Sequence, residues 1–310
     1  MIRVEAPGLM TTVQDLGREG FGPIGVSACG AADPIALRIG NRLLGNREGA
    51  AGLEMTLVGG TFRFEIDTWL ALTGSDFGAM LQEAPVPPGV VRPVRQGQIL
   101  RMQATRSGAR CTLCVSGGID VPPVLGSCST HVLSGLGGFN GRALRKGDLL
   151  HVGPGQPPPA RQVNPRFAER LAPRLRLRVT DGVQSDWFAE PSKRAFFDTG
   201  YRVTETSDRM GLRLEGVAVQ TRSPVEMITA PVALGAVQVP PNGQPLIVFV
   251  EQQTTGGYPV IAHVVAADQA SIGQLRPRDV IEFEPVSLEA ARELFLEQEA
   301  WLESADLLMA

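Results

Sequence analysis

The sequence predicts a mainly β protein with a few short helices. Its 310 residues include 36 glycines and 24 prolines, but only 12 phenylalanines and 2 tyrosines. Short apolar stretches recur along the chain, and Gly-Gly, Gly-Ser-Asp, Gly-Gln and Lys-Gly-Asp turns separate them. This pattern is typical of short strands joined by tight turns. A hydrophobic content of 43% is enough to fill the core of a folded protein.

The first half of the chain shows three kinds of local signal. Residues 8–34 are polar and rich in glycine, so we expect loops and short strands held by side-chain hydrogen bonds. Asp33 and Pro34 provide an N-cap and an N1 proline for a helix that ends at Gly45. Residues 49–152 have strand character throughout, which predicts a closed or sandwiched antiparallel domain.

The second half restarts after a stretch rich in proline and glycine, residues 153–173, which we interpret as a connection between lobes. The predicted domains are therefore an N-terminal β lobe at residues 1–160, a second β lobe at 174–286 and a C-terminal helix at 287–310. Ser287 caps that helix, whose expected apolar face consists of Leu288, Ala291, Leu294, Phe295 and Leu302.

Charge and known motifs exclude several classes of function. The formal charge is −3, with no long block of one sign, so nothing indicates binding to nucleic acid or to an anionic membrane. The N-terminus has no apolar signal region and no window reaches the length of a spanning helix, which indicates a cytoplasmic protein. Walker-type, dinucleotide, HExxH and GxSxG signatures do not occur.

The cysteines have a spacing that superficially fits a zinc site, because Cys111, Cys114, Cys128 and His131 read as C-x2-C followed by C-x2-H. Cys111 and Cys114, however, lie in a stretch that favours a strand, where residues three apart point to opposite faces. We therefore interpret the thiols as reduced and structural, and we expect no metal site.

Residues 249–260, FVEQQTTGGYPV, join two apolar strands predicted at 246–250 and 260–265. Five polar residues and two glycines offer more hydrogen-bonding capacity than a chain reversal needs. A long, well-satisfied hairpin loop is one interpretation. The other is that this segment lines a pocket, since paired glycines let backbone amides approach a ligand closely.

Four segments, in order along residues 4–286, carry a family resemblance: GLMTTVQDLGREGFGPIGVSACGAADPIALRIGNRLLGN, GGIDVPPVLGSCSTHVLSGLGGFNGRAL, SDRMGLRLEG and GAVQVPPNGQPLIVFVEQQTTGGYP. Together they resemble the family of the 5-oxoprolinase C subunit, also called allophanate hydrolase subunit 2 or the biotin-dependent carboxyltransferase family. The resemblance implies cyclophilin-like β-barrel lobes. It also implies two partners, the 5-oxoprolinase B subunit, which is similar to the Kip-type kinase inhibitor, and the A subunit.

The resemblance implies an enzyme subunit that acts on an amide-like group. In a 5-oxoprolinase, the A, B and C subunits together open the lactam of 5-oxoproline to glutamate with consumption of ATP, so ATP with Mg²⁺ is expected in the assembled complex. The first alternative is a carboxyltransferase subunit that moves a carboxyl group from carboxybiotin to a urea- or amide-like acceptor. This chain has no Met-Lys-Met biotinylation sequence, so biotin would act in trans. The second alternative is a non-catalytic regulator that binds a kinase-inhibitor partner.

The same segments imply the site residues. Expected catalytic residues are Asp208, Arg209, Gln253 and Tyr258, with Arg209 offering its planar fork to an anion and Asp208 orienting that fork. Glycine amides would form an oxyanion-type cradle. Expected substrate-binding residues are Ser207, Gln238, Gln244, Thr254, Thr255, Gly256, Gly257, Thr12, Asp15, Arg18, Ser129 and Thr130.

Two features qualify these assignments. The residues Thr12, Asp15 and Arg18 have an equally weighted alternative, a hydrogen-bonded plug that closes the barrel or meets the B subunit. The family often has Asp-Arg before Gln-Thr-Thr-Gly-Gly-Tyr, whereas this sequence has Glu251 and Gln252 there.

Overall fold

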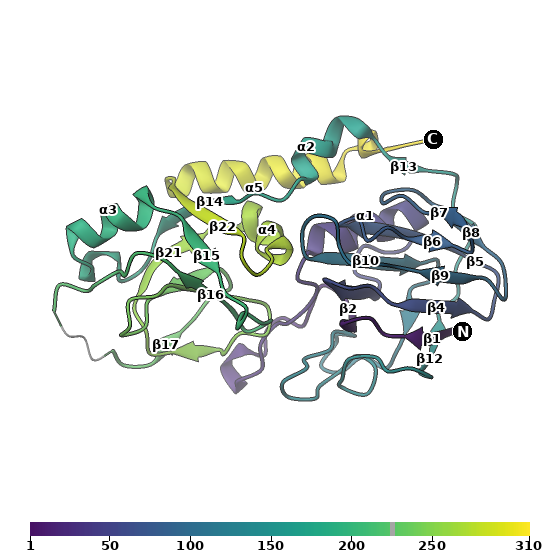
Figure 1. The fold of residues 1–310 in the computed structure, drawn as a ribbon, viewed down its shortest axis with the longest axis horizontal. Helices are drawn as coiled ribbons and strands as arrows, with labels where there is room; N and C mark the ends of the chain where they lie inside the picture. Colours follow the sequence, from purple (N-terminus) through teal and green to yellow (C-terminus); the bar gives the residue numbers. More distant parts are fainter. Residues whose placement is uncertain (224–226) are drawn as a thin grey trace. The chain divides into compact units, whose positions relative to one another are not determined.

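The computed structural model describes residues 1–223 and 227–310, which form two compact units (Figure 1). Unit 1 comprises Met1–Arg18, Cys29–Ala172 and Leu302–Ala310, and unit 2 comprises Glu19–Ala28 and Pro173–Trp301. The expected domains were continuous stretches of the chain, whereas each unit combines segments that are separate in sequence. Residues 19–28 belong to unit 2, and the last nine residues and most of the expected connection belong to unit 1.

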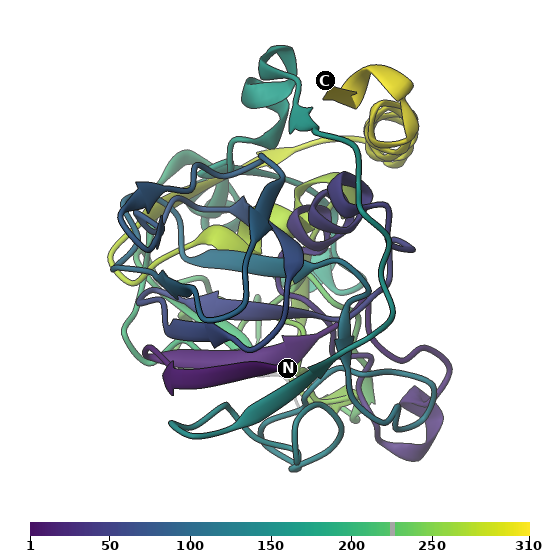
Figure 2. The same cartoon turned by 90° about the vertical axis from the view of Figure 1, so that its right-hand side faces the viewer.

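Unit 1 is built from two antiparallel sheets, in agreement with a sandwiched domain (Figure 2). The strands of the larger sheet are, in spatial order, β11 (Ile119–Asp120), β12 (Leu149–Val152), β1 (Ile2–Ala6), β4 (Thr61–Phe64), β9 (Ile99–Arg101), β6 (Met80–Leu81) and β7 (Ala84–Pro85). Those of the smaller sheet are β2 (Met10–Gln14), β3 (Gly52–Thr56), β10 (Arg110–Val115), β5 (Thr68–Gly74) and β8 (Arg92–Val94).

Both sheets contribute to one apolar core, which includes Val4 and Phe62 from the larger sheet and Leu53 and Leu113 from the smaller one. The helix α1 (Pro34–Leu44) packs on the smaller sheet, and its ends match the sequence. Asp33 accepts a hydrogen bond from the backbone of Ala36, and Gly45 ends the helix in the left-handed conformation with a φ of 70°.

The two cysteines of β10 point to opposite faces, as the strand prediction required. Cys111 belongs to the core between the sheets, while Cys114 approaches the carbonyl of Leu37 in α1 at 3.8 Å. Within residues 1–223 and 227–310, no three His, Cys, Asp or Glu side chains come together as a metal site.

We expect both buried thiols to resist alkylation in the native protein. Burial raises the pKa of Cys114 to about 12 and also raises the pKa of Cys111, so neither thiol ionises near neutral pH. Iodoacetamide at pH 8, followed by peptide mass spectrometry, should label them only after unfolding in urea. Rapid labelling of Cys111 and Cys114 in the folded chain would contradict this assignment.

Unit 2 is a closed barrel of seven strands, which confirms the mainly β class and gives this lobe the barrel that the resemblance implied. The spatial order is β14 (Arg176–Asp181), β21 (Val260–Val264), β18 (Ala236–Gln238), β19 (Leu246–Val248), β16 (Gly211–Glu215), β15 (Tyr201–Val203) and β22 (Val280–Pro285). A two-stranded ribbon joins β17 (Ala230–Pro231) to β20 (Thr255–Gly256).

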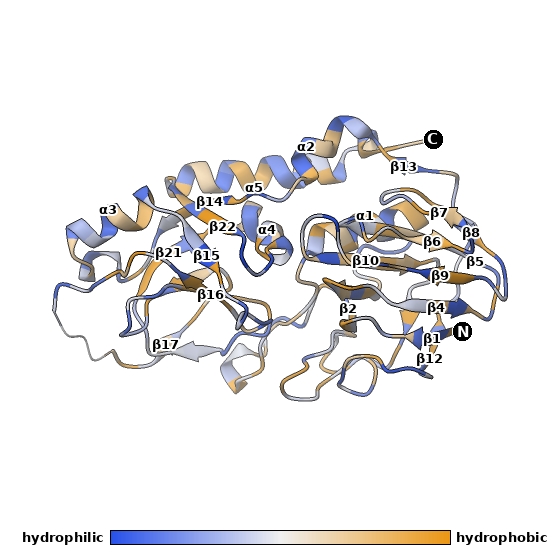
Figure 3. Ribbon diagram, viewed as in Figure 1, coloured by the Kyte–Doolittle hydropathy of each residue, from blue (hydrophilic) through white to orange (hydrophobic). Residues whose placement is uncertain are grey.

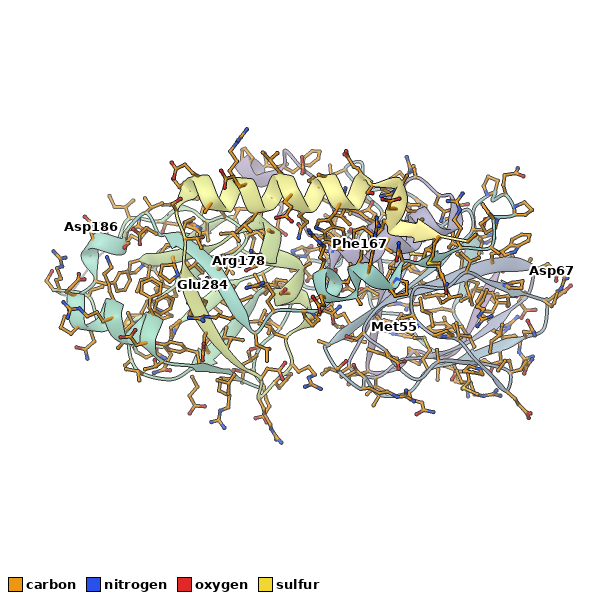
Figure 4. All side chains as sticks on the ribbon, turned by 90° about the horizontal axis from the view of Figure 1, so that it is seen from above. Met55, Asp67, Phe167, Arg178, Asp186 and Glu284 are labelled. Atoms are coloured by element: carbon orange, nitrogen blue, oxygen red, sulfur yellow. The ribbon has the colours of Figure 1, made fainter. Side chains whose placement is uncertain are left out.

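Helices complete unit 2. The helix α3 (Glu190–Asp198) contributes Phe196, whose ring stacks on Phe283 of β22 with centroids 4.5 Å apart. The helix α4 (Gln269–Gln274) follows Asp268, whose buried carboxylate accepts a hydrogen bond from Arg178 Nε at 3.0 Å. Arg178 lies beside Glu284 in the parallel pairing of β14 with β22 (Figure 4).

The C-terminal helix α5 (Leu288–Glu303) begins at the expected cap, because Ser287 Oγ accepts a hydrogen bond from the backbone of Ala290 at 3.1 Å. Its predicted apolar face is mostly not buried. Leu302 is buried, but Leu288 is 72% exposed and Phe295 is 40% exposed. Figure 3 shows hydrophobic and hydrophilic residues alternating along this helix.

The chain does not end as a helix. After α5, the strand β23 (Leu308–Met309) pairs with β13 (Gln162–Val163) in unit 1, near the short helix α2 (Ala168–Leu171). The stretch interpreted as a connection between lobes is therefore partly ordered by strand pairing. No helix among the described residues is long and apolar enough to cross a membrane.

The strands on either side of residues 249–260 do not form a hairpin, which corrects one interpretation of that segment. β19 and β21 both pair with β18, so β18 lies between them in the barrel. The connecting segment crosses the end of β18 and forms β20 of the ribbon on the way. Because the segment passes from β19 across β18 to β21, it is longer than a hairpin turn.

Candidate functional site

Unit 1 brings together the five N-terminal site residues that the sequence indicated, with two further residues, in a group we call the Asp15 cluster: Thr12, Gln14, Asp15, Arg18, Ser127, Ser129 and Thr130. The strand β2 ends at Gln14, and the following residues meet the segment 127–130. Every member is at least nine-tenths buried. Gln14 and Ser127 were not identified from the sequence.

Asp15 anchors the cluster, because four donors converge on its carboxylate. Oδ1 accepts hydrogen bonds from Ser127 Oγ at 2.6 Å, Ser129 Oγ at 2.5 Å and the Gly17 amide at 2.8 Å. Oδ2 accepts one from the Cys128 amide at 2.6 Å. A carboxylate that accepts four hydrogen bonds from the protein has a structural function and offers little to a substrate.

Thr12, Gln14 and Thr130 extend the cluster along β2. Thr130 Oγ1 donates to the carbonyl of Val13 at 2.8 Å. Gln14 Nε2 donates to Thr12 Oγ1 and to the Thr130 carbonyl, both at 3.0 Å. The polar groups of Thr12, Asp15, Ser129 and Thr130 thus tie two chain segments together.

Arg18 differs from its neighbours because its charge meets only carbonyl groups. Nη2 donates to the carbonyl of Ser129, and Nε donates to the carbonyl of Val124 at 3.4 Å. Nη1 is buried without a hydrogen-bond partner, and the residue is 2% exposed. Buried arginine is costly without a counter-charge, so this group stands out electrostatically.

In unit 2, Arg209 and Glu251 form a buried ion pair. Arg209 Nε lies 2.5 Å from Glu251 Oε1, and the side chains are 4% and 3% exposed. Backbone hydrogen bonds from Glu251 to Arg209 and from Phe249 to Met210 continue the pairing of β19 with β16 and bring the two side chains together. The arginine that was expected to hold a substrate anion already has a protein carboxylate.

Asp208 does not have the orienting role that we expected, because Glu251 supplies the carboxylate for Arg209. Asp208 Oδ1 instead accepts hydrogen bonds from the amides of Met210 at 2.8 Å and Gly211 at 3.2 Å, which stabilises the turn before β16. Ser207 Oγ likewise accepts a hydrogen bond from the amide of Arg213 in β16.

Gln244 is also engaged locally, since its side chain makes two hydrogen bonds to the backbone of Gly216, at 2.9 and 3.2 Å. It accepts one hydrogen bond, donates the other, and joins the ends of β16 and β19. Its geometry indicates a structural function for this glutamine.

The segment 251–259 places its glutamines around the ribbon of β17 and β20. Gln238 at the end of β18 is fully buried, and its Nε2 approaches the Tyr258 carbonyl at 3.4 Å. A Cβ on Gly256 would lie 2.6 Å from Gln238 Nε2 and 3.1 Å from Gln253 Nε2. Gly256 is therefore required so that two side-chain amides can pack against its backbone.

Two amide oxygens near this ribbon are buried without a partner, those of Gln238 and Gln252. Gln252 Nε2 donates to the carbonyl of Val232 at 3.2 Å. Val232 packs in a small apolar cluster with Ala236, Val248 and Val260. Unpaired buried acceptors are uncommon in folded proteins and mark positions where a donor from a ligand would be stabilised.

The remaining members of the segment face solvent. Gln253, Thr255, Gly257 and Tyr258 are exposed, and Thr254 is half-buried. Gly256 pairs with Ala230 in the ribbon, so its backbone is already used there. A cradle of two consecutive glycine amides, as expected from the sequence, is not what this segment forms.

The positions that depart from the family pattern have clear environments. Glu251 keeps the negative charge and pairs with Arg209. Gln252 places a neutral amide at the position where the family resemblance led us to expect an arginine. Alternation along the strand could have indicated that Glu251 points inward, but the identity of its partner depends on pairing across 42 residues of sequence.

Comparisons with known proteins agree with this architecture. The family model for the carboxyltransferase domain, subdomain A and B, matches residues 24–285. The chain is 39% identical to the 5-oxoprolinase C subunit of Escherichia coli (strain K12), over 97% of this chain and 98% of that protein. It is also 39% identical to the 5-oxoprolinase C subunit of Haemophilus influenzae, over 94% of this chain and 93% of that protein.

Among solved structures, the urea amidolyase of K. lactis superimposes with a TM-score of 0.90 at 31% identity, over 99% of this chain and 20% of that larger chain. The resemblance drawn from the four sequence segments is confirmed by these matches. The chain belongs to the carboxyltransferase domain family, subdomains A and B, and within it is a relative of the 5-oxoprolinase C subunit.

Proposed function

We propose that this chain is the C subunit of a 5-oxoprolinase and works with the partner A and B subunits in the cytoplasm. The observation that supports this most strongly is the degree of identity. The chain is 39% identical to two 5-oxoprolinase C subunits over nearly the whole of each, and 32% identical to the urea amidolyase of Saccharomyces cerevisiae.

The reaction opens a lactam: water is added, the bond between the ring nitrogen and the carbonyl carbon is broken, and glutamate is formed. Glutamine, serine, threonine and arginine side chains suit recognition of such a planar amide. ATP and Mg²⁺ belong to the assembled complex in this proposal. The described residues of this chain bring together no metal-ligating group, so we derive no step through either one.

Reconstitution tests the proposal directly. Glutamate release from 5-oxoproline would be measured with ATP and with all three subunits, and then with each of them omitted in turn. We expect activity only from the complete set. Lack of activity in a verified complex would reject the proposal.

Carboxyl transfer is the second candidate, favoured by the structural match to urea amidolyase. Biotin would then come from a partner in trans. A complex that is silent on 5-oxoproline but carboxylates urea or an amide in the presence of a biotin-bearing partner would select this function.

Replacing Gln253 by alanine should lower turnover of the complete complex by about 10²-fold, the usual cost of losing one positioned donor. Gln253 is exposed, so the fold and the assembly should be preserved. Gln220→Ala removes another exposed glutamine of unit 2 and serves as the control. Equal turnover of both variants would remove Gln253 from the site.

A further inference from the structure

The helix α5 carries large apolar side chains that the protein does not cover. Leu288 is 72% exposed, Phe295 is 40% exposed and Leu296 is 46% exposed. Their spacing of i, i+7 and i+8 places them on one side of the helix, as a group we call the α5 stripe. A single exposed leucine is ordinary, whereas three large apolar residues together on one helix face indicate a docking surface.

Other residues of α5 hold the helix in place. Gln298 Nε2 donates a hydrogen bond to the carbonyl of Ala267 at 2.8 Å, and Leu302 is buried. The first turn is fixed by the cap at Ser287, and the chain after the helix is fixed by the pairing of β23 with β13. The α5 stripe is therefore presented on a preformed helix, so a partner would not have to order it on binding.

The charge of α5 restricts what can cover the stripe. The helix contains five glutamates and one arginine, which gives a formal charge of −4, whereas the whole chain carries −3. The net negative charge of the protein is thus concentrated in this one helix. Negative charge repels nucleic acid and anionic membranes, and it also disfavours pairing of the same helix face from two copies of the chain.

Three of the glutamates form a row on the surface of the helix. Glu289, Glu293 and Glu297 follow one another at i, i+4 and i+8, and all three are exposed. Arg178 of the barrel is close enough to Glu297 to be affected by its charge. Like charges four residues apart weaken a helix, so this row is a local conflict within α5. Cations supplied by a partner would relieve the conflict.

We propose that α5 docks into an apolar groove with a basic rim on a partner subunit. Leu288, Phe295 and Leu296 enter the groove, and the glutamate row faces lysine or arginine side chains on the rim. The 16 residues of the helix fit a groove about 24 Å long. The identity of the partner, the A or the B subunit of a 5-oxoprolinase, rests on the proposed function.

Binding of the whole chain to the purified A and B subunits, each immobilised separately, tests the apolar part of the proposal. Phe295→Ala should weaken binding to one of the two subunits by about 30-fold, the size of the effect at an interface hot spot. Alanine preserves the helix because its helix propensity is high. Val217→Ala is the control, because Val217 is 47% exposed elsewhere in unit 2, and it should bind like the wild-type chain.

A double variant, Glu289→Gln with Glu293→Gln, tests the basic rim. Wild-type binding should weaken by about tenfold when NaCl is raised from about 50 mM to about 500 mM, because salt screens exposed charges. The double variant should bind more weakly at low salt and should lose most of this salt dependence. Glu83→Gln changes an exposed glutamate of unit 1 and serves as the control.

The outcomes separate this inference from the proposed function. The docking surface is overturned if Phe295→Ala and the glutamine variant bind both subunits normally, or if neither subunit binds the wild-type chain. It is also overturned if Phe295→Ala abolishes self-association of the chain or its binding to phosphatidylcholine vesicles, because the stripe then has another occupant. Glutamate release by the same samples reports on the proposed function. Binding that depends on α5 supports the surface even where no glutamate is released.

Discussion

Replacing Glu251 by alanine is expected to lower the free energy of unfolding of unit 2 by about 3–5 kcal/mol, the usual result of leaving one member of a buried ion pair behind. Both Glu251 and Arg209 are almost fully buried. Arg209→Ala should have a similar cost for the same reason. Hydrogen exchange of peptides from β16 and β19, measured by mass spectrometry in the whole chain, would report the change within unit 2.

A double variant, Arg209→Met with Glu251→Leu, separates stability from function. Apolar side chains of similar size often replace a buried pair at little cost, so the double variant should be more stable than either single alanine variant. An exposed pair, Arg202 with Glu215 in the same unit, provides the control. Equal destabilisation by the single and double changes would show that the two side chains do not act as a pair.

The double variant also decides what Arg209 does in the enzyme. Loss of turnover in Arg209→Ala alone would say little, because an unpaired Glu251 disturbs the same strands. A folded double variant with normal turnover would remove Arg209 from the catalytic residues. A folded but inactive one would keep the catalytic role that the sequence suggested.

The local parts of the fold could be predicted from sequence because neighbouring residues determine them. Asp33, Pro34 and Gly45 set the ends of α1, as expected. The polar, glycine-rich segment before α1 was expected to be held by side-chain hydrogen bonds, and Asp15 holds it in this way.

Contacts between distant segments could not be predicted in the same way. The hairpin interpretation of residues 249–260 is wrong because β18 inserts between β19 and β21, and no local signal specifies that order. Arg209 pairs with Glu251 and not with the neighbouring Asp208, and this contact between distant segments has no local signal either. The turn at Asp208 was foreseeable, since an aspartate readily binds the amides two and three residues ahead.

The same distinction between local contacts and contacts of distant segments applies to the candidate site. Residue types alone indicated which side chains are polar enough to bind an amide. Whether each of them is free to do so depends on its partners, and Asp15, Ser129, Gln244 and Asp208 use their polar groups within the protein. The atoms left without partners belong to Gln14, Arg18, Gln238 and Gln252 among others, and Gln14 and Gln252 were not candidates.

Replacing Asp15 by alanine is expected to destabilise unit 1 by at least about 3 kcal/mol, since it leaves buried hydroxyl groups and amides without their charged acceptor. Ser127, Ser129 and the Cys128 amide would all lose a short hydrogen bond. Urea unfolding and hydrogen exchange of peptides spanning β2 and residues 127–130 would measure the loss. Asp120→Ala, at an exposed carboxylate of the same unit, should change stability by about 0.5 kcal/mol or less.

The conservative change Asp15→Asn distinguishes an anchor from a chemical group. An asparagine presents an NH₂ group to at least one of the four donors, so an anchoring carboxylate predicts a loss of stability, with turnover retained in the complex that still folds. A chemical role predicts normal stability and affinity with turnover alone abolished. We expect the first pattern, since the geometry gives the carboxylate of Asp15 four protein partners.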